Sequence, residues 1–384
     1  MARLYSSGFE LNSSTNGVEL RQWSGATVVS DVPRNGTYAA LLDGVNDFFR
    51  LNFALTNQAD GFYFRSYIRF TSFPVSLTEF INIENVSSAD KVSVRVNSDG
   101  TLELWNDEDG AQIGGDSPAL LTNVWYRIEV EVDATTISST ALDARINGTS
   151  FASGTVDFAE GVGQFQMVAL GVIFEARIDD IAINDNNGSF QNTFPGVGSI
   201  IHLLPNNTGD NSDWTNTYTN IDEVTPDDAT TLISSNTLDQ IEDVNLADTT
   251  ASIGNNDSIN VVAVGVRFNG VGASANASFV LRIKASSGGT VEEGSTLTPS
   301  NATWATNTIT TVPEFTNYNL TLYNLPGAST IAWTKADLNN AQIGVRLSAS
   351  STNAVQVSTL WLLVDYIPGS SANIGYKSLL GIGL

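Results

Sequence analysis

The chain has 384 residues, of which 42% are hydrophobic and only 15% are charged, a composition typical of globular domains. Asp and Glu number 41 against 17 Lys and Arg, giving a formal net charge of −24, and because an acidic surface repels phosphate groups we expect no nucleic-acid and no membrane partner. The absence of cysteine excludes thiol nucleophiles, disulfides and cysteine-based zinc sites.

The N-terminal segment MARLYSSGFELN lacks the apolar run of a secretory signal. No segment approaches the ~20 apolar residues that a membrane span requires. We therefore expect synthesis in the cytoplasm without a signal peptide.

Alternation of apolar and polar residues dominates the first half of the chain. It is clearest in GFYFRSYIRF (61–70), KVSVRV (91–96), TLELW (101–105) and WYRIEVEVD (125–133). Strands of this kind bury one face, and Asn, Asp and Gly between them accept the backbone conformations of tight turns. The pattern predicts an antiparallel β-sandwich.

Periodicity lapses over residues 188–199, where Gly and Pro collect, and strands resume beyond it. The segment VVAVGVRF (261–268) is almost entirely apolar, which predicts a central strand covered on both faces. We predict an all-β protein with two antiparallel, jelly-roll-like β-sandwich domains. The divisions are a first sandwich over 1–190, a linker over 191–199, a second sandwich over 200–368 and a C-terminal docking tail over 369–384.

One short helix is predicted within WTKADLNNA (333–341). Thr334 can cap its N-terminus, Asp337 stands at the capping-box position, and Trp333 can pack on Leu338 as a hydrophobic staple.

The first half resembles the laminin-G-like, concanavalin-A-like family of sandwich domains. The likeness lies in an ordered set of segments: GFEL near the start, YAALLDG (38–44), NSDGTLELWNDEDG (97–110), NVWYRIEVEVD (123–133) and ARIDDIAIND (176–185). The resemblance implies a concanavalin-A-like sandwich over the first domain.

The second half resembles a module of tailed-phage structural proteins. The segments that carry this likeness are YTNIDEVTPDDATTLISS (218–235), VVAVGVRF (261–268) and WTKADLNNAQIGVRLS (333–348). The abundance of Asn, Thr and Ser is also typical of extracellular β-proteins and of virion proteins. The resemblance implies a virion component, such as a capsid decoration, head-fibre or tail-fibre protein, whose partners are other virion proteins.

One histidine and one group of three acids are candidate catalytic residues. His202 in SIIHLLP lacks a neighbouring acid that could orient it as a base, so we interpret it as part of an apolar strand. Glu129, Glu131 and Asp133 alternate along one strand, as acids do in some glycosidases with this fold. The other face of that strand is the core, and we interpret the trio as a solvated face. We expect no enzymatic activity.

The closing strand EARIDDIAINDNNGSF (175–190) is dense in carboxylates. In a regular strand Asp179 shares a face with Ile181 and Ile183, so we predict that it points inward and that adjacent Asp180 points the other way. A buried carboxylate must be hydrogen-bonded, paired or bound to metal. We expect Asp179 to tie the strand to the loops near Glu10. The alternative is a structural calcium ion bound by the carboxylates of Asp179 and Glu10.

Carbohydrate binding would use an exposed aromatic ring beside amides and carboxylates. Trp105 points away from Leu102 and Leu104 by alternation and adjoins Asp107 and Asp109 in the turn NDEDG. Trp214, in the polar segment DNSDWTNTY, is a second candidate. These four residues, Trp105, Asp107, Asp109 and Trp214, form the predicted ligand-binding set; the alternative is that both rings cover a sheet face or an inter-domain contact.

Three classes of function remain: a structural virion protein, a carbohydrate-binding adhesin or receptor-binding protein, and a glycan hydrolase or lyase. We predict the first, acting through protein–protein contacts, with binding of a host-surface glycan as an added role. Exposed sheet edges and the apolar tail also predict a homo-oligomer, with a trimer as the expected symmetry.

Overall fold

The structure is a computed structural model that describes residues 3–52, 61–85, 87, 89–159, 162–169, 173–186, 189–228, 230–249, 252–272, 276–299, 302–306 and 320–369. The predicted C-terminal docking tail lies almost entirely outside these residues. No helix in the described part of the chain is long and apolar enough to cross a membrane.

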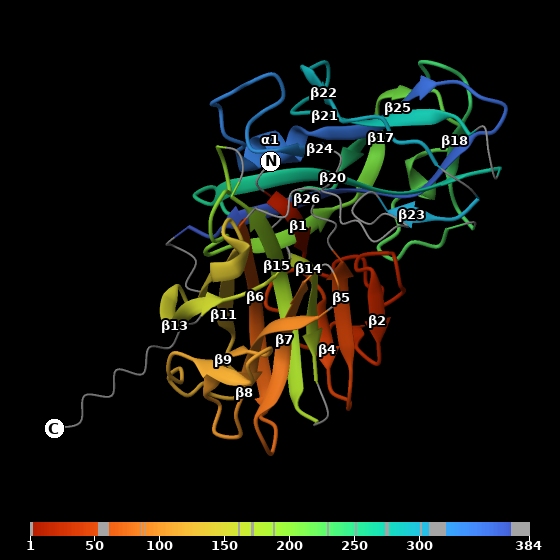
Figure 1. The fold of residues 1–384 in the computed structure, drawn as a ribbon. Helices are drawn as coiled ribbons and strands as arrows, with labels where there is room; N and C mark the ends of the chain where they lie inside the picture. The colour runs from red at the N-terminus through yellow and green to blue at the C-terminus, as the bar shows by residue number, and fades with distance from the viewer. Residues whose placement is uncertain are drawn as a thin grey trace.

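The first sandwich consists of two antiparallel sheets that enclose one apolar core (Figure 1). Sheet A has the order β13 (Thr149–Val156), β12 (Thr140–Ile146), β11 (Tyr126–Asp133), β6 (Gly61–Ser72), β15 (Glu175–Asp185), β4 (Ala39–Leu42) and β3 (Thr27–Val29), with β1 (Arg3–Ser7) on β15. Sheet B has the order β10 (Ala111–Ile113), β9 (Leu102–Asn106), β8 (Asp90–Val96), β7 (Thr78–Asn85), β14 (Val162–Val168), β5 (Phe48–Asn52) and β2 (Gln22–Ser24). A short 3₁₀ helix, Ile137–Ser139, precedes β12.

The second sandwich, green to blue in Figure 1, is built from two further antiparallel sheets. Sheet C has the order β16 (Ser199–Leu203), β26 (Val355–Ile367), β20 (Ser258–Gly270) and β23 (Ala305–Thr306), with β18 (Ile233–Ser235) on β26 and β24 (Leu320–Leu322) on β20. Sheet D has the order β17 (Pro205–Ser212), β19 (Ile241–Leu246), β25 (Gln342–Ala349), β21 (Ser278–Lys284) and β22 (Val291–Glu293). A 3₁₀ helix, Tyr218–Asn220, and the helix α1, Lys335–Asn340, lie in its connections.

The all-β, antiparallel sandwich predicted from alternation is confirmed. Phe62, Phe64, Ile68 and Phe70 of β6 are buried in the first core, as the period of two requires. The apolar segment 261–268 lies within β20, which pairs with β26 on one side and with β23 and β24 on the other. It is therefore the central strand that its composition predicts.

The predicted helix is also confirmed, with its cap. Thr334 accepts a hydrogen bond from the Asp337 amide, and the Asp337 side chain accepts one from the Thr334 amide. Trp333 and Leu338 are both buried in the second core. These local interactions end the preceding turn and begin a helix of only six residues.

The prediction for Asp179 is wrong because β15 contains a β-bulge. Asp179 lies opposite Tyr67 of β6 whereas Ala182 lies opposite Arg65, so one extra residue is inserted in β15 between the two pairs. Asp180 adopts a positive φ of 52° at this point. The insertion shifts the alternation by one residue, and Asp179 therefore lies on the outer face of sheet A with Arg65 and Tyr67.

The bulge lies where the two sandwiches meet. Asp180 accepts a hydrogen bond from the Ile200 amide (2.6 Å) in the second domain and forms an ion pair with Arg34. Asp365 of β26 is fully buried and pairs with Arg3 at 2.5 Å and with Arg65 at 3.4 Å. Charged side chains of the first sandwich are thus neutralised by the second.

Apolar contacts complete this interface. Leu11 and Val18 of the first domain pack with Ile200, Ala263, Trp361 and Leu363 of the second. The Trp361 ring lies over Gly265, where a Cβ atom would approach the ring to 2.0 Å. Gly265 is therefore needed for the ring to lie flat on the sheet.

Candidate functional site

Polar side chains form one continuous row across the outer face of sheet B. The strand registers place these residues opposite one another in the order Trp105, Ser93, Asn82, Gln166, Arg50 and Gln22. We call this set the polar row. Since neighbouring strands lie about 4.8 Å apart, the row extends for roughly 24 Å.

The polar row faces outward because its neighbours along each strand fill the core. Leu104, Val94 and Phe165 are fully buried in the first sandwich, and each adjoins a member of the row. Alternation then directs the row to the opposite face.

Trp105 has the outward orientation predicted from the sequence, since Leu102 and Leu104 are buried in the core. Its ring is partly exposed. The Arg95 guanidinium lies 4.3 Å from the ring centroid, and Trp105 Nε1 donates a hydrogen bond to Glu103 Oε2 at 2.7 Å. These contacts hold the ring in one orientation on the face of the sheet.

The two predicted aspartates have different positions. Asp107 accepts hydrogen bonds from Ser93 Oγ (2.8 Å) and Arg95 Nη2 (2.7 Å), so it belongs to the polar face. Burial raises the pKa of Asp107 above its usual value. Asp109 is exposed at the hairpin turn and accepts a hydrogen bond from Asn106 Nδ2 (2.7 Å). Asp109 therefore lies at the margin of the face, within the turn.

Glu79 and Asn82 are functional candidates that sequence reasoning missed. Burial raises the pKa of Glu79 to about 7, although Asn82 Nδ2 donates a hydrogen bond to its carboxylate at 2.6 Å. Two buried acceptors, Asn82 Oδ1 and Asp107 Oδ2, have no hydrogen-bond partner within the described ranges. Glu79 lies on β7 and Asp107 follows β9, so the two are distant in the sequence. The pairing of β7 with β8 and of β8 with β9 brings them close together.

Carboxylates outnumber cations on this face. The acids are Glu79, Glu84, Asp90, Glu103 and Asp107, and the cations are Arg50, Lys91 and Arg95. Lys91 and Arg95 already form ion pairs with Glu108 and Asp107. The face therefore offers amide and carboxylate groups to a ligand and little positive charge.

Trp214 does not have the position predicted for a stacking platform. Its side chain is only 4% exposed and belongs to the core of the second sandwich. Its Nε1 donates to the Gln240 carbonyl at 3.2 Å. The Trp214 ring faces inward although the sequence around it is polar. The prediction that Trp214 binds a ligand as an exposed ring is therefore wrong.

The acidic trio of β11 lies on the outer face of sheet A. Glu129 is buried and accepts hydrogen bonds from Arg127 Nε and the Gly196 amide, both at 2.9 Å. The segment after β15 thus lies against Glu129, which is not the fully solvated residue predicted. Glu131 and Asp133 are less buried, and burial raises the pKa of Glu131.

His202 lies in β16 as expected, and its ring stacks on Trp361 with 5.7 Å between centroids. Both ring nitrogens are buried without a hydrogen-bond partner among described residues. Burial lowers the pKa of His202 to about 3, so the ring is neutral at physiological pH. Nothing in this environment orients His202 as a base.

Asp179 and Glu10 both bind the loop that precedes β4. Asp179 Oδ2 accepts from the amides of Arg34 (2.9 Å) and Asn35 (3.3 Å), and Glu10 accepts from the Thr37 amide (3.0 Å). Asp179 thus bonds the 34–37 loop and not the chain near Glu10 that we predicted, and Glu10 bonds the same loop separately. Over the described residues, no group of three or more His, Cys, Asp or Glu side chains is arranged to hold a metal ion.

Comparison with known proteins gives distant structural likenesses. No family model matches the chain, and no curated protein matches it. A cellulose-induced protein is 16% identical with a TM-score of 0.38, covering 50% of this chain and 98% of that one.

Two further solved structures illustrate the range of these likenesses. An endo-β-1,4-glucuronan lyase from the fungus Trichoderma reesei is 12% identical with a TM-score of 0.36, covering 49% of this chain and 100% of its own. Domain 4 of an extracellular arabinanase from Geobacillus stearothermophilus, solved with arabinotriose, is 16% identical with a TM-score of 0.34, covering 48% and 93%. At these values the likenesses assign no activity to the chain.

Proposed function

We propose that the chain is a carbohydrate-binding protein and that the polar row of sheet B binds a neutral oligosaccharide. The observation that supports this proposal is the row itself, roughly 24 Å long, in which the Trp105 ring is followed by partly exposed amide and guanidinium groups at Gln166, Arg50 and Gln22. A ring can stack on the apolar face of a sugar while the polar groups bond its hydroxyls.

A neutral ligand fits the charge of this face. A polyuronate or a sialylated glycan would meet an excess of carboxylates, and the chain as a whole carries a net charge of −24. Sugar hydroxyls, by contrast, can bond the partly exposed side chains of Gln166, Arg50 and Gln22.

The proposal is for binding without bond cleavage. Glu103 and Asp107 accept hydrogen bonds from Trp105 and Arg95, respectively, so both acids position the groups that would contact the sugar. Release of reducing ends from a bound glycan, lost in Glu79→Gln, would instead indicate a hydrolase.

A glycan array of neutral and anionic oligosaccharides, followed by titration of the strongest hit, tests the proposal. We expect neutral glycans to bind and Trp105→Ala to weaken binding about tenfold, equivalent to about 1.4 kcal/mol. Trp304→Ala, which removes another partly exposed ring in the second domain, is the matched control and should retain affinity. Binding of anionic glycans alone, or equal effects of both variants, would contradict the proposal.

The setting that we propose for this binding is the surface of a phage particle, with the chain as a non-enzymatic, oligomeric virion component. Its support is the sequence resemblance of the second half together with the acidic composition rich in Asn, Thr and Ser. Electron microscopy of virions labelled with an antibody against the chain tests it. Particles that lack the chain would overturn the virion assignment and leave the glycan proposal standing.

A further inference from the structure

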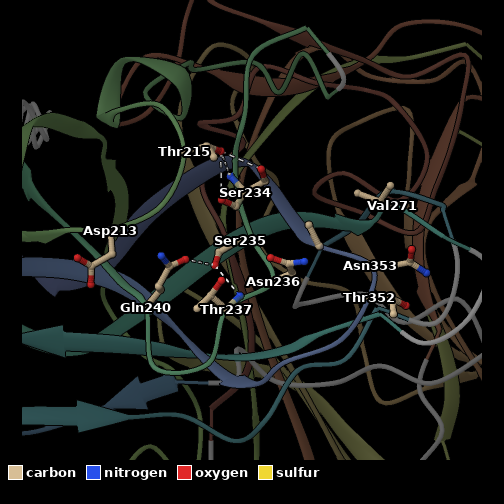
Figure 2. Close-up of a pocket in the computed structure, with 11 residues that line it drawn as sticks. Asp213, Thr215, Ser234, Ser235, Asn236, Thr237, Gln240, Val271, Thr352 and Asn353 are labelled. Atoms are coloured by element: carbon tan, nitrogen blue, oxygen red, sulfur yellow. Dashed lines mark hydrogen bonds between the residues drawn. The ribbon is translucent and has the colours of Figure 1, made fainter.

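A polar pocket lies in the second sandwich, away from the polar row of sheet B. It has a volume of about 450 Å³ and is formed by the chain after β17, by β18 with the turn that follows it, and by the turn that precedes β26 (Figure 2). Nine of its eleven lining residues carry hydroxyl, amide or carboxyl side chains. The volume lies within the range of small-molecule sites.

Hydrogen bonds fix one wall of the pocket. Ser235 Oγ donates to Gln240 Oε1 at 2.5 Å and accepts from the Thr237 amide at 3.2 Å (Figure 2). The backbone carbonyl of Gln240 in turn accepts a hydrogen bond from Nε1 of Trp214, and the Trp214 ring lies in the core. A ligand would therefore meet groups that are already ordered.

Thr215 and Ser234 are held in the same way. Thr215 Oγ1 lies 2.8 Å from Ser234 Oγ and accepts from the Ser234 amide at 3.0 Å. Figure 2 shows the Asn236 amide pointing toward the side on which Asn353 and Val271 lie. Asn236 and Thr352 are exposed, so both can reach a bound molecule.

The chemistry of the lining selects a class of ligand. Hydroxyl and amide groups both donate and accept, as sugar hydroxyls do. Of the described lining residues, Asp213 alone is charged, and its Oδ2 accepts from the Ile241 amide at 3.1 Å. Among the described residues, no Lys or Arg lines the pocket to hold an anion, and no aromatic side chain lines it to stack on a ring.

We propose that this pocket is a second binding site and that it takes a neutral mono- or disaccharide, held by hydrogen bonds alone. The site stands independently of sheet B, since the described residues that line it all belong to the second sandwich. Two sugar sites on one chain would strengthen attachment to a surface that displays many copies of the glycan.

Saturation-transfer NMR of the full-length chain tests the pocket, with glucose, galactose, N-acetylglucosamine and lactose as probes at millimolar concentration. We expect at least one of these sugars to bind, and Asn236→Ala and Thr352→Val each to weaken its affinity about fivefold. Asn256→Ala, an exposed amide in another turn of the same domain, is the matched control and should leave affinity unchanged.

The Trp105→Ala variant separates the pocket from the polar row. A pocket ligand should bind this variant as it binds the unmodified chain, even where binding of longer glycans is lost. The proposal is overturned if none of the four sugars binds, if Trp105→Ala abolishes their binding, or if Asn236→Ala and Thr352→Val both retain full affinity while their melting temperatures are unchanged.

Discussion

Single residues on the outer faces of this protein are more buried than their outward orientation suggests. Ser93 and Asn82 face away from the core of the first sandwich, yet both are almost completely covered. Polar side chains from neighbouring strands bond to them: Asn82 donates to Asp90 of β8, and Ser93 donates to Asp107, which follows β9. A polar group in such surroundings loses hydration, and its ionisation becomes less favourable.

Glu79 gives a test at this scale. Its pKa is raised to about 7 in the folded chain from 4.5, chiefly by burial. The folded state therefore holds its proton more tightly, and the stability from Glu79 is present below pH 4.5 and lost as the pH rises through about 7. Between pH 4.5 and about pH 7, the unfolding free energy of the unmodified chain should fall more steeply with pH than that of the Glu79→Gln variant. The difference in slope should be about 1.4 kcal/mol per pH unit.

Urea unfolding at a series of pH values from about pH 5 to about pH 9 measures this difference. Glu108→Gln is the control, because Glu108 lies beside the same sheet with 51% of its side chain exposed and its carboxylate stays hydrated. A Glu79→Gln profile parallel to that of the unmodified chain would contradict the assignment of a buried, protonated Glu79.

At the scale of elements, two short motifs end or redirect regular structure. The capping box of α1 begins a helix of six residues between two strands. The bulge in β15 inserts one residue and moves Asp179 and Asp180 to the interface between the sandwiches. Each motif involves only a few residues. The cap can be predicted from the sequence alone, whereas the bulge is defined by the pairing of β15 with its partner strand.

Thr334→Ala should lower the unfolding free energy by about 1 kcal/mol, because the Asp337 amide loses its side-chain acceptor. Thr334→Ser keeps a hydroxyl at the same position and should restore most of this loss. Denaturant titration of the three proteins measures the effect. Equal losses in the Ala and Ser variants would show that the hydroxyl does not cap the helix.

At the scale of the whole molecule, the two sandwiches share a buried and charged interface. Asp365 is enclosed with Arg3 and Arg65, and an apolar cluster around Trp361 adjoins it. Removing one member of a buried ion pair leaves its partners charged and desolvated. Loss of Asp365 should therefore cost more unfolding free energy than loss of one member of a surface ion pair.

Asp365→Asn should lower the unfolding free energy by about 3–5 kcal/mol. Asp239→Asn, which breaks an ion pair to Arg346 in which Asp239 is 72% exposed, should cost less than about 1 kcal/mol. Urea unfolding followed by tryptophan fluorescence compares them. Similar losses in the two variants would mean that Asp365 is not enclosed between the domains in solution.

Local patterns in the chain predict the all-β architecture, the buried faces of the strands and the capped helix, because alternation and capping depend on neighbours within a few residues. They also predict that Trp105 faces outward beside the turn that holds Asp107. The grouping of Glu79, Asn82 and Arg95 with these residues depends on the tertiary fold, since strand register brings together residues that are distant in the chain. The same holds for Trp214 and Asp179, whose positions follow from core packing and from a bulge that no local pattern reveals.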